Sequence, residues 1–87
     1  MSESRTTDVA AGPGGVMTDE VGVVTGDLTV RTEAGPDGTV HATVAYQGAL
    51  DWYAITGAPT TLAGEDLDAV HGALVERVRH GDGQQPV

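Results

Sequence analysis

The three histidines, His41, His71 and His80, are the side chains that could most directly do chemistry in this chain. Imidazole is the commonest ligand for transition metals in proteins. However, no His-x-x-x-His pattern and no carboxylate-rich ligand spacing surrounds any of them. The chain also has no cysteine, which excludes thiol catalysis, disulfides and cysteine-based zinc sites. The sequence therefore predicts no metal site and indicates no other cofactor.

Acid–base catalysis would need a carboxyl group whose pKa is moved toward neutral pH by burial or by a close partner. The four carboxylates that come nearest to forming such a pair fall in turns or in the expected first helical turn, where capping and solvation explain them: Asp51, Glu65, Asp66 and Asp68. The only serines, Ser2 and Ser4, lie in a polar N-terminal segment, and no glycine-rich phosphate-binding motif is present. We therefore expect no catalytic residues and no enzyme activity.

The aromatic residues are better candidates, as binding residues. Successive strand residues point to opposite faces, so one of Trp52 and Tyr53 enters the core while the other lies on the far face near His41. An exposed Trp or Tyr beside Tyr46 would make a binding hot spot. The alternative is that both are structural, one in the core and one along the sheet edge. The candidate binding residues, including one helical histidine, are Trp52, Tyr53, Tyr46, His41 and His71.

The stretch 39–56 organises the elements that must position these residues. Its apolar residues alternate with polar ones from Val40 onward, which is typical of a half-buried strand, and 52–56 reads as a second strand. Residues 20–33 predict an earlier strand, with a bulge near Gly22 or Gly26 because the parity of its valines changes there. The turn chemistry of 34–38, Ala-Gly-Pro-Asp-Gly, predicts a hairpin between the first two strands.

A helix is predicted to follow the strands. Its buried stripe recurs at helical spacing and comprises Leu67, Val70, Leu74 and Val78. Thr61 is the expected N-cap of a helix that begins near residues 62–65, and Gly81 is the expected C-terminal cap. Gly72 inside the helix suggests a close packing contact. The sequence therefore predicts an α+β fold, in which a three-stranded antiparallel meander precedes one C-terminal helix packed on one sheet face.

The polar, glycine-rich ends predict a single domain over residues 20–80, with flexible tails at 1–19 and 81–87. No signal peptide is visible and no apolar run is long enough to span a bilayer, so we expect a soluble cytoplasmic protein. The absence of lysine and the abundance of Gly, Ala, Val, Asp and Thr are typical of coding bias in a high-GC bacterial genome.

Thirteen acidic residues face four arginines, which gives a formal charge of −9. This balance argues against binding to nucleic acid or to anionic lipid, because both depend on clustered Lys and Arg. A domain this small has a thin core, and its sheet has free edges. We therefore expect a homodimer, joined along an edge strand or through the uncovered sheet face.

The preferred function is a small acidic, non-catalytic interaction or regulatory module that binds another protein through the sheet face or the Trp52–Tyr53 region. The alternative is a small-molecule-binding or enzyme-accessory protein whose pocket lies between sheet and helix, near Tyr46, Tyr53 and His71. An acidic mimic of nucleic acid is a third reading. Its expected array of carboxylates on one surface is not evident, because the acidic residues are spread along the chain.

Overall fold

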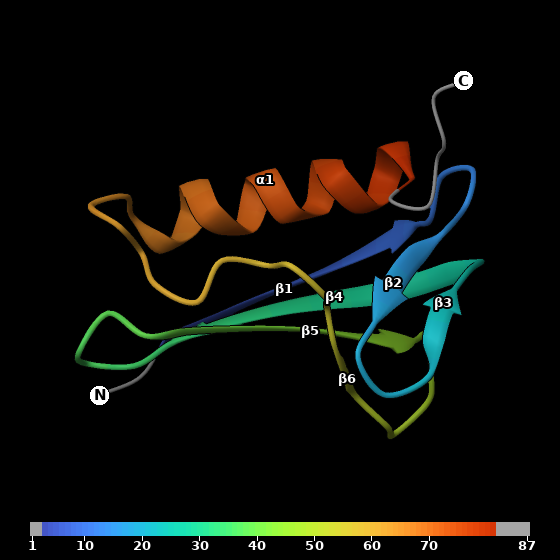
Figure 1. The fold of residues 1–87 in the computed structure, drawn as a ribbon, viewed down its shortest axis with the longest axis horizontal. Coiled ribbons are helices and arrows are strands. Elements are labelled where there is room, and N and C mark those ends of the chain that lie inside the picture. The colour runs from blue at the N-terminus through green and yellow to red at the C-terminus, as the bar shows by residue number, and fades with distance from the viewer. Residues whose placement is uncertain (1–2, 82–87) are drawn as a thin grey trace.

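The computed structural model describes residues 3–81 and has an α+β fold, in which a single helix packs against an antiparallel sheet (Figure 1). In chain order the elements are β1 (Glu3–Ala10), β2 (Val16–Thr18), β3 (Gly22–Val24), β4 (Asp27–Ala34), β5 (Val40–Tyr46), β6 (Tyr53–Ala54) and α1 (Leu67–His80). The predicted class is confirmed, as is the packing of a C-terminal helix on one sheet face. The number of strands is larger than predicted.

The predicted meander is present as β4, β5 and β6, which are neighbours in an antiparallel sheet of order β1-β4-β5-β6. The β4–β5 turn forms as its sequence indicated. The Asp37 carboxylate accepts hydrogen bonds from the backbone N–H of Thr39, at 3.1 Å, and from its hydroxyl, at 2.6 Å. Gly38 adopts a φ of +84°, which an L side chain rarely tolerates.

The prediction that residues 1–19 form a flexible tail is wrong for residues 3–18. Residues 3–10 form β1, which pairs along its whole length with β4 in the register Glu3↔Ala34 to Ala10↔Asp27. Only Val9 in this strand is a buried apolar residue, so hydrophobic patterning could not reveal it. Polar contacts with the helix replace that burial: the Arg5 guanidinium donates to Asp68, and the Thr7 hydroxyl bonds to His71.

The predicted strand over residues 20–33 is in fact two strands. β3 turns away from β4 and pairs with β2 in a separate two-stranded ribbon, so the change at Gly26 is a turn with φ +90° and not a bulge. This explains the change in valine parity, because Val24 faces the core while Val23 lies on the outer side of the ribbon and is 45% exposed. The Thr18↔Ile55 bridge then links the ribbon to the segment that follows β6.

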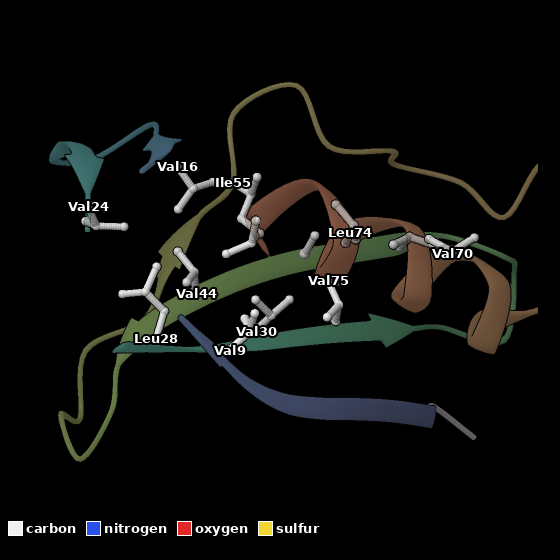
Figure 2. Packing of buried hydrophobic residues seen from close by; sticks show 13 residues of the cluster. Val9, Val16, Val24, Leu28, Val30, Val44, Ile55, Val70, Leu74 and Val75 are labelled. Carbon is white, nitrogen blue, oxygen red and sulfur yellow. The ribbon is translucent and has the colours of Figure 1, made fainter. Parts of the chain in front are cut away.

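The core lies between the sheet, the helix and the β2–β3 ribbon. α1 packs over β1 and β4, while Val16 and Val24 of the ribbon and Ile55 close the other end of the cluster (Figure 2). The even-numbered residues of β4, and those of β5 up to Val44, are buried on this side, as their alternation predicted. The fully buried members are small for a core and are mostly valine: Val16, Val24, Leu28, Val30, Val40, Val44 and Val78.

The helix begins later than predicted, and its N-cap is Asp66 instead of Thr61. The Asp66 carboxylate accepts a hydrogen bond from the Ala69 N–H at 2.8 Å. The preceding residues cannot be helical, because Ala63 and Gly64 have φ values of +52° and +86°. The C-terminal prediction is confirmed: Gly81 has φ +96°, and its N–H donates to the carbonyls of Arg77 and Val78.

Gly72 does not make the close contact that its position in the helix suggested. Nothing lies within 4 Å of the place where a Cβ would stand, and the residue is exposed. A glycine inside a helix costs about 1 kcal/mol relative to alanine. No contact within residues 3–81 offsets that cost.

His71 is a buried polar residue in the core, with 8% of its surface exposed. Both ring nitrogens are hydrogen-bonded to threonine hydroxyls: Nε2 lies 2.7 Å from Thr7 Oγ1 and Nδ1 lies 2.9 Å from Thr32 Oγ1. Burial lowers the pKa of His71, and the nearby Arg5 charge lowers it further against a smaller opposing effect of Asp68. The neutral ring is therefore the form that the fold favours, and it ties α1 to both β1 and β4.

We predict that acid destabilises the protein through His71. Because the pKa of His71 is lower in the folded state, the unfolded chain binds the proton more readily. The stabilisation that the neutral His71 ring gives the folded protein is complete above the unfolded pKa of about 6.5. It is lost as the pH falls through the folded pKa. Urea unfolding between about pH 7 and pH 5 should therefore show a falling free energy of unfolding.

His71→Gln is the diagnostic variant, because an amide can bond to both threonines and does not titrate. It should lower the free energy of unfolding by about 1–2 kcal/mol at neutral pH and flatten the slope between pH 7 and pH 5. His41→Gln, at an exposed position, is the matched control and should leave both quantities unchanged. An unaltered slope in His71→Gln would show that His71 is not the titrating group.

Candidate functional site

The side of the sheet opposite α1 is the surface on which a site can be built, and we call it the open face. α1 and the β2–β3 ribbon both pack on the other side, in the core. The strand registers place these residues on the open face: Ser4, Thr6 and Asp8 of β1, Thr29, Arg31 and Glu33 of β4, His41, Thr43 and Ala45 of β5, and Ala54 of β6 with Trp52 beside it. The open face is thus mainly hydroxyl-bearing and charged.

Trp52 and Arg31 form the centre of the open face. The Arg31 Cζ atom lies 4.2 Å from the centroid of the Trp52 ring, which is cation–π geometry. Continuing the β5–β6 register by one residue sets Trp52 opposite Ala45. Ala45 is only 2% exposed although it belongs to the open face, as expected if the indole crosses above it toward Arg31. The small side chain at position 45 leaves room for the ring.

Arg31 also keeps unused hydrogen-bonding capacity. Its Nε is buried and has no hydrogen-bond partner, and the nearest carboxylate oxygen, Glu33 Oε1, is 4.0 Å away. The other three arginines are engaged: Arg5 with Asp68 at 2.6 Å, Arg79 with Glu76 at 2.8 Å and Arg77 with the carbonyl of Thr56 at 2.6 Å. A donor without an acceptor is costly when buried. The Arg31 side chain as a whole is 34% exposed, so a partner can contact it although the Nε atom is inaccessible.

A hollow of about 210 Å³ opens beside the open face at His41. It forms because the segment between residues 55 and 60 bends away from the edge of β5. This segment is bonded to β5 at one end, where the Ile55 N–H donates to Ala42, and at the other, where the Val40 N–H donates to the carbonyl of Thr60. The residues that line the gap include Asp19, His41, Thr43, Pro59 and Thr60. The hollow is large enough for one side chain and too small for a drug-sized ligand.

The structure separates the five candidate residues that the sequence indicated. Trp52 and His41 lie on the open face, which resolves the choice between Trp52 and Tyr53. Tyr53 stands opposite Val44 on the core side, and Tyr46 lies opposite Leu28 at the end of β5, where it is 44% exposed. His71 belongs to the core. No single site contains all five.

Arg31 and Ala45 are the site residues that sequence reasoning missed. The signal for Arg31 was its parity, which placed it in the polar row of its strand together with Thr29 and Glu33. Its contact with Trp52 depends on the register between three strands, which a single sequence does not reveal. Ala45 gave no signal, because an alanine fits either face of a strand.

A second cavity, of about 270 Å³, lies between α1 and the segment that precedes it. It is lined by Pro59, Thr61, Leu62, Ala63, Glu65, Val70, Ala73, Leu74 and Arg77. Its walls are mostly apolar, with one carboxylate and one guanidinium. This cavity is not the pocket predicted between sheet and helix near Tyr46, Tyr53 and His71, because none of those three residues lines it.

The structure gives the four carboxylates considered for catalysis either a structural contact or an exposed position. Asp66 caps α1 and Asp68 pairs with Arg5, while Asp51 and Glu65 are exposed. In the part of the chain that the structure describes, no group of three or more His, Asp or Glu side chains is close enough to hold a metal ion.

We predict that the Trp52 ring depends on the small residue beneath it. Ala45→Leu should push the indole away from Arg31 and into solvent, because the added atoms would occupy the space below the ring. The Trp52 emission should shift to longer wavelength, with a stability loss of about 1 kcal/mol from the lost cation–π contact and packing. Ala10→Leu, on the same face at the end of β1, is the control and should leave the emission unchanged.

Comparison of the chain with protein families, with curated proteins and with solved structures found no match. No helix in the described range 3–81 is long and apolar enough to cross a membrane.

Proposed function

We propose that this protein is a non-catalytic interaction module that binds a protein partner through the open face, with Trp52 and Arg31 as its anchor. The observation that carries the proposal is the Arg31 guanidinium stacked on Trp52 with its Nε lacking an acceptor. Trp and Arg, together with Tyr, are enriched among the residues that dominate binding energies at protein interfaces. Here Trp52 and Arg31 lie together at the centre of the open face.

The shape of the open face supports a polypeptide as the ligand. A sheet surface is broad and nearly flat, which suits an extended interface better than a small molecule. The hydroxyls of Thr6, Thr29 and Thr43 lie around the Trp52–Arg31 pair. Thr29 donates to Asp8 and Thr43 to the Arg31 carbonyl, so these two hydroxyls can still accept hydrogen bonds from a partner. The hollow beside His41 would take one partner side chain at the rim.

The charges define what the partner should present. At the centre, the exposed part of the Arg31 side chain calls for a carboxylate or a backbone carbonyl on the partner. Around it lie Asp8 and Glu33, so the periphery favours basic groups. With only one arginine on the open face and a chain charge of −9, a nucleic acid is an unsuitable partner.

Affinity capture with the purified protein as bait tests this function. Proteins recovered with the wild type and lost with Trp52→Ala should be produced recombinantly and titrated against both forms by calorimetry. Trp52→Ala and Arg31→Ala should each weaken binding by about 2 kcal/mol, roughly thirtyfold. Arg31→Lys should recover only part of the loss, because a lysine cannot reproduce the planar stack.

Leu50→Ala is the matched control for the capture experiment. Leu50 is an apolar residue, 92% exposed, in the β5–β6 loop, so the variant removes surface hydrophobicity without altering the open face. It should bind like the wild type. Partners lost equally from Leu50→Ala and Trp52→Ala would indicate non-specific hydrophobic capture and would refute the proposed anchor.

The second cavity supports a different function, binding of a small molecule between α1 and the segment 59–65. Apolar walls with Glu65 and Arg77 at the rim suit a compact ligand that carries one polar group. Ala73→Leu would fill the space without adding charge. Under this alternative, a ligand found by shifts of the amide signals of Val70 and Leu74 should lose its effect in Ala73→Leu and keep it in Trp52→Ala.

A further inference from the structure

The outer edge of β1 presents a regular row of backbone groups. In an antiparallel pair, residues that exchange both backbone bonds with the facing strand alternate with residues whose N–H and C=O point away. The Ala11 N–H donates to the carbonyl of Gly26 at 2.9 Å, and this pair continues the β1–β4 register. The odd-numbered residues of β1 therefore bond to β4. The N–H and C=O groups that point outward belong to Ser4, Thr6, Asp8 and Ala10.

The neighbouring strand pair gives the same alternation. The Gln47 N–H donates to the carbonyl of Asp27 at 3.1 Å, in continuation of the β4–β5 register. The odd-numbered residues of β4 thus bond to β5, which leaves the even-numbered residues for β1. The two observations agree on which groups of β1 are left facing outward.

β1 lacks the devices that normally protect a sheet edge. Natural edge strands are short, bulged, or carry proline or outward-reaching lysine. β1 has eight residues, an unbroken register and neither proline nor lysine. Two of its three charged side chains are held by neighbouring elements, since Arg5 bonds to Asp68 of α1 and Asp8 accepts from the Thr29 hydroxyl at 2.7 Å. Arg5 also donates to the Ser4 carbonyl at 3.0 Å, and that oxygen keeps a second lone pair for a facing strand. An edge of this kind is a template for another strand.

A second copy of the chain fits this edge about a two-fold axis at Thr7. In that register Thr6 faces Asp8 and Ser4 faces Ala10 of the other copy, so every outward-pointing residue finds a backbone partner. The Thr6 hydroxyls can also donate to the facing Asp8 carboxylates. A shift of the axis to Asp8 would instead place the two Asp8 side chains opposite each other, which repulsion disfavours.

The helices support the same axis. α1 lies over β1 and β4 with His71 directly bonded to Thr7, so the axis at Thr7 passes beside the first half of the helix. Strands are about 4.8 Å apart, which brings the two α1 axes to about 10 Å, close to the spacing of packed helices. The flank of α1 that faces past β1 carries the exposed residues Asp68, Gly72 and Arg79, while Val75 at its border is buried in the core. Gly72 then lies where the helices meet, and its missing Cβ permits the close approach.

We propose that the protein forms a two-fold symmetric dimer in which β1 pairs with β1 of a second copy about Thr7, with the α1 helices side by side at Gly72. The axis is perpendicular to the sheet, so both open faces lie on the same side and stay uncovered. The dimer is therefore independent of the proposed function of the open face. It joins two four-stranded sheets into one and presents two Trp52–Arg31 pairs on a single surface.

Light scattering and amide hydrogen exchange on the unmodified protein test the dimer. At high concentration the mass should be twice that of one chain. The amides of Ser4, Thr6, Asp8 and Ala10 should change from fast to slow exchange as the dimer forms, while those of Arg5, Thr7 and Val9 remain slow throughout. A monomeric mass at all concentrations, or a dimer in which these outward amides stay in fast exchange, would overturn the proposal.

A separate measurement tests the register of the two β1 strands in the dimer. In a dimer prepared from one labelled and one unlabelled copy, magnetisation transfer should connect the Hα of Arg5 with the Hα of Val9 in the other copy, because these residues form a close non-hydrogen-bonded pair in the proposed register. A transfer from Arg5 to Thr7 instead would place the axis at Thr6 and contradict the register about Thr7.

Two variants separate the edge from the rest of the fold. Thr6→Pro removes an outward N–H that β4 does not use, so it should halve the mass and preserve the Trp52 emission and the helix content. Thr6→Val keeps the N–H and should stay dimeric. Gly72→Gln places a long side chain between the helices and should also give a monomer, with helix content at least equal to that of the wild type.

Added salt provides a check on the charge of the dimer. Each copy carries a formal charge of −9, so the copies repel each other at low ionic strength. Screening should strengthen the association of wild type and Thr6→Val several-fold and leave Thr6→Pro monomeric. A dimer that persists in both Thr6→Pro and Gly72→Gln would be joined at another surface and would refute the β1 interface.

Discussion

The hydrogen bonds of His71 to Thr7 and Thr32 are the contact on which the architecture depends. A core made mainly of valine offers little area per residue, and β1 contributes only Val9 to it. The helix is held over β1 and β4 by a buried polar residue that bonds to both strands, with Arg5 and Asp68 extending the attachment at the surface. Buried polar groups of this kind specify one arrangement, because any displacement of the helix leaves all three groups without partners.

That attachment also decides which surfaces remain available. Since α1 sits over β1 and β4, the core side of β5 is closed by the β2–β3 ribbon and the segment 55–62, which leave only small hollows. The opposite side of the sheet receives no covering element among residues 3–81. Trp52 and Arg31 stack on each other there, and the surface is hydroxyl-rich with this single stacked cation at its centre.

The sequence predicted the elements whose signals are local. The alternation in β4 and β5, the Pro-Asp-Gly turn, the apolar stripe of the helix and its Gly81 cap all follow from residue types at short range. β1 escaped prediction because its inward residues Arg5 and Thr7 are polar, and their partners Asp68 and His71 lie more than sixty positions away. The Trp52–Arg31 contact could not be predicted either, because it also joins residues far apart in the sequence and depends on the register of three strands.

The close approach of Gly12 and Gly81 has a consequence for how the chain reaches its native state. A Cβ on Gly12 would collide with the carbonyl of Arg79, and one on Gly81 would collide with that of Pro13, so the segment after β1 and the end of α1 interlock through backbone alone. The β4–β5 hairpin can form early because its contacts are local. β1 can pair with β4 before α1 forms, but Arg5 and Thr7 find Asp68 and His71 only once the helix is present. The attachment of β1 and the Gly12–Gly81 contact are therefore completed late.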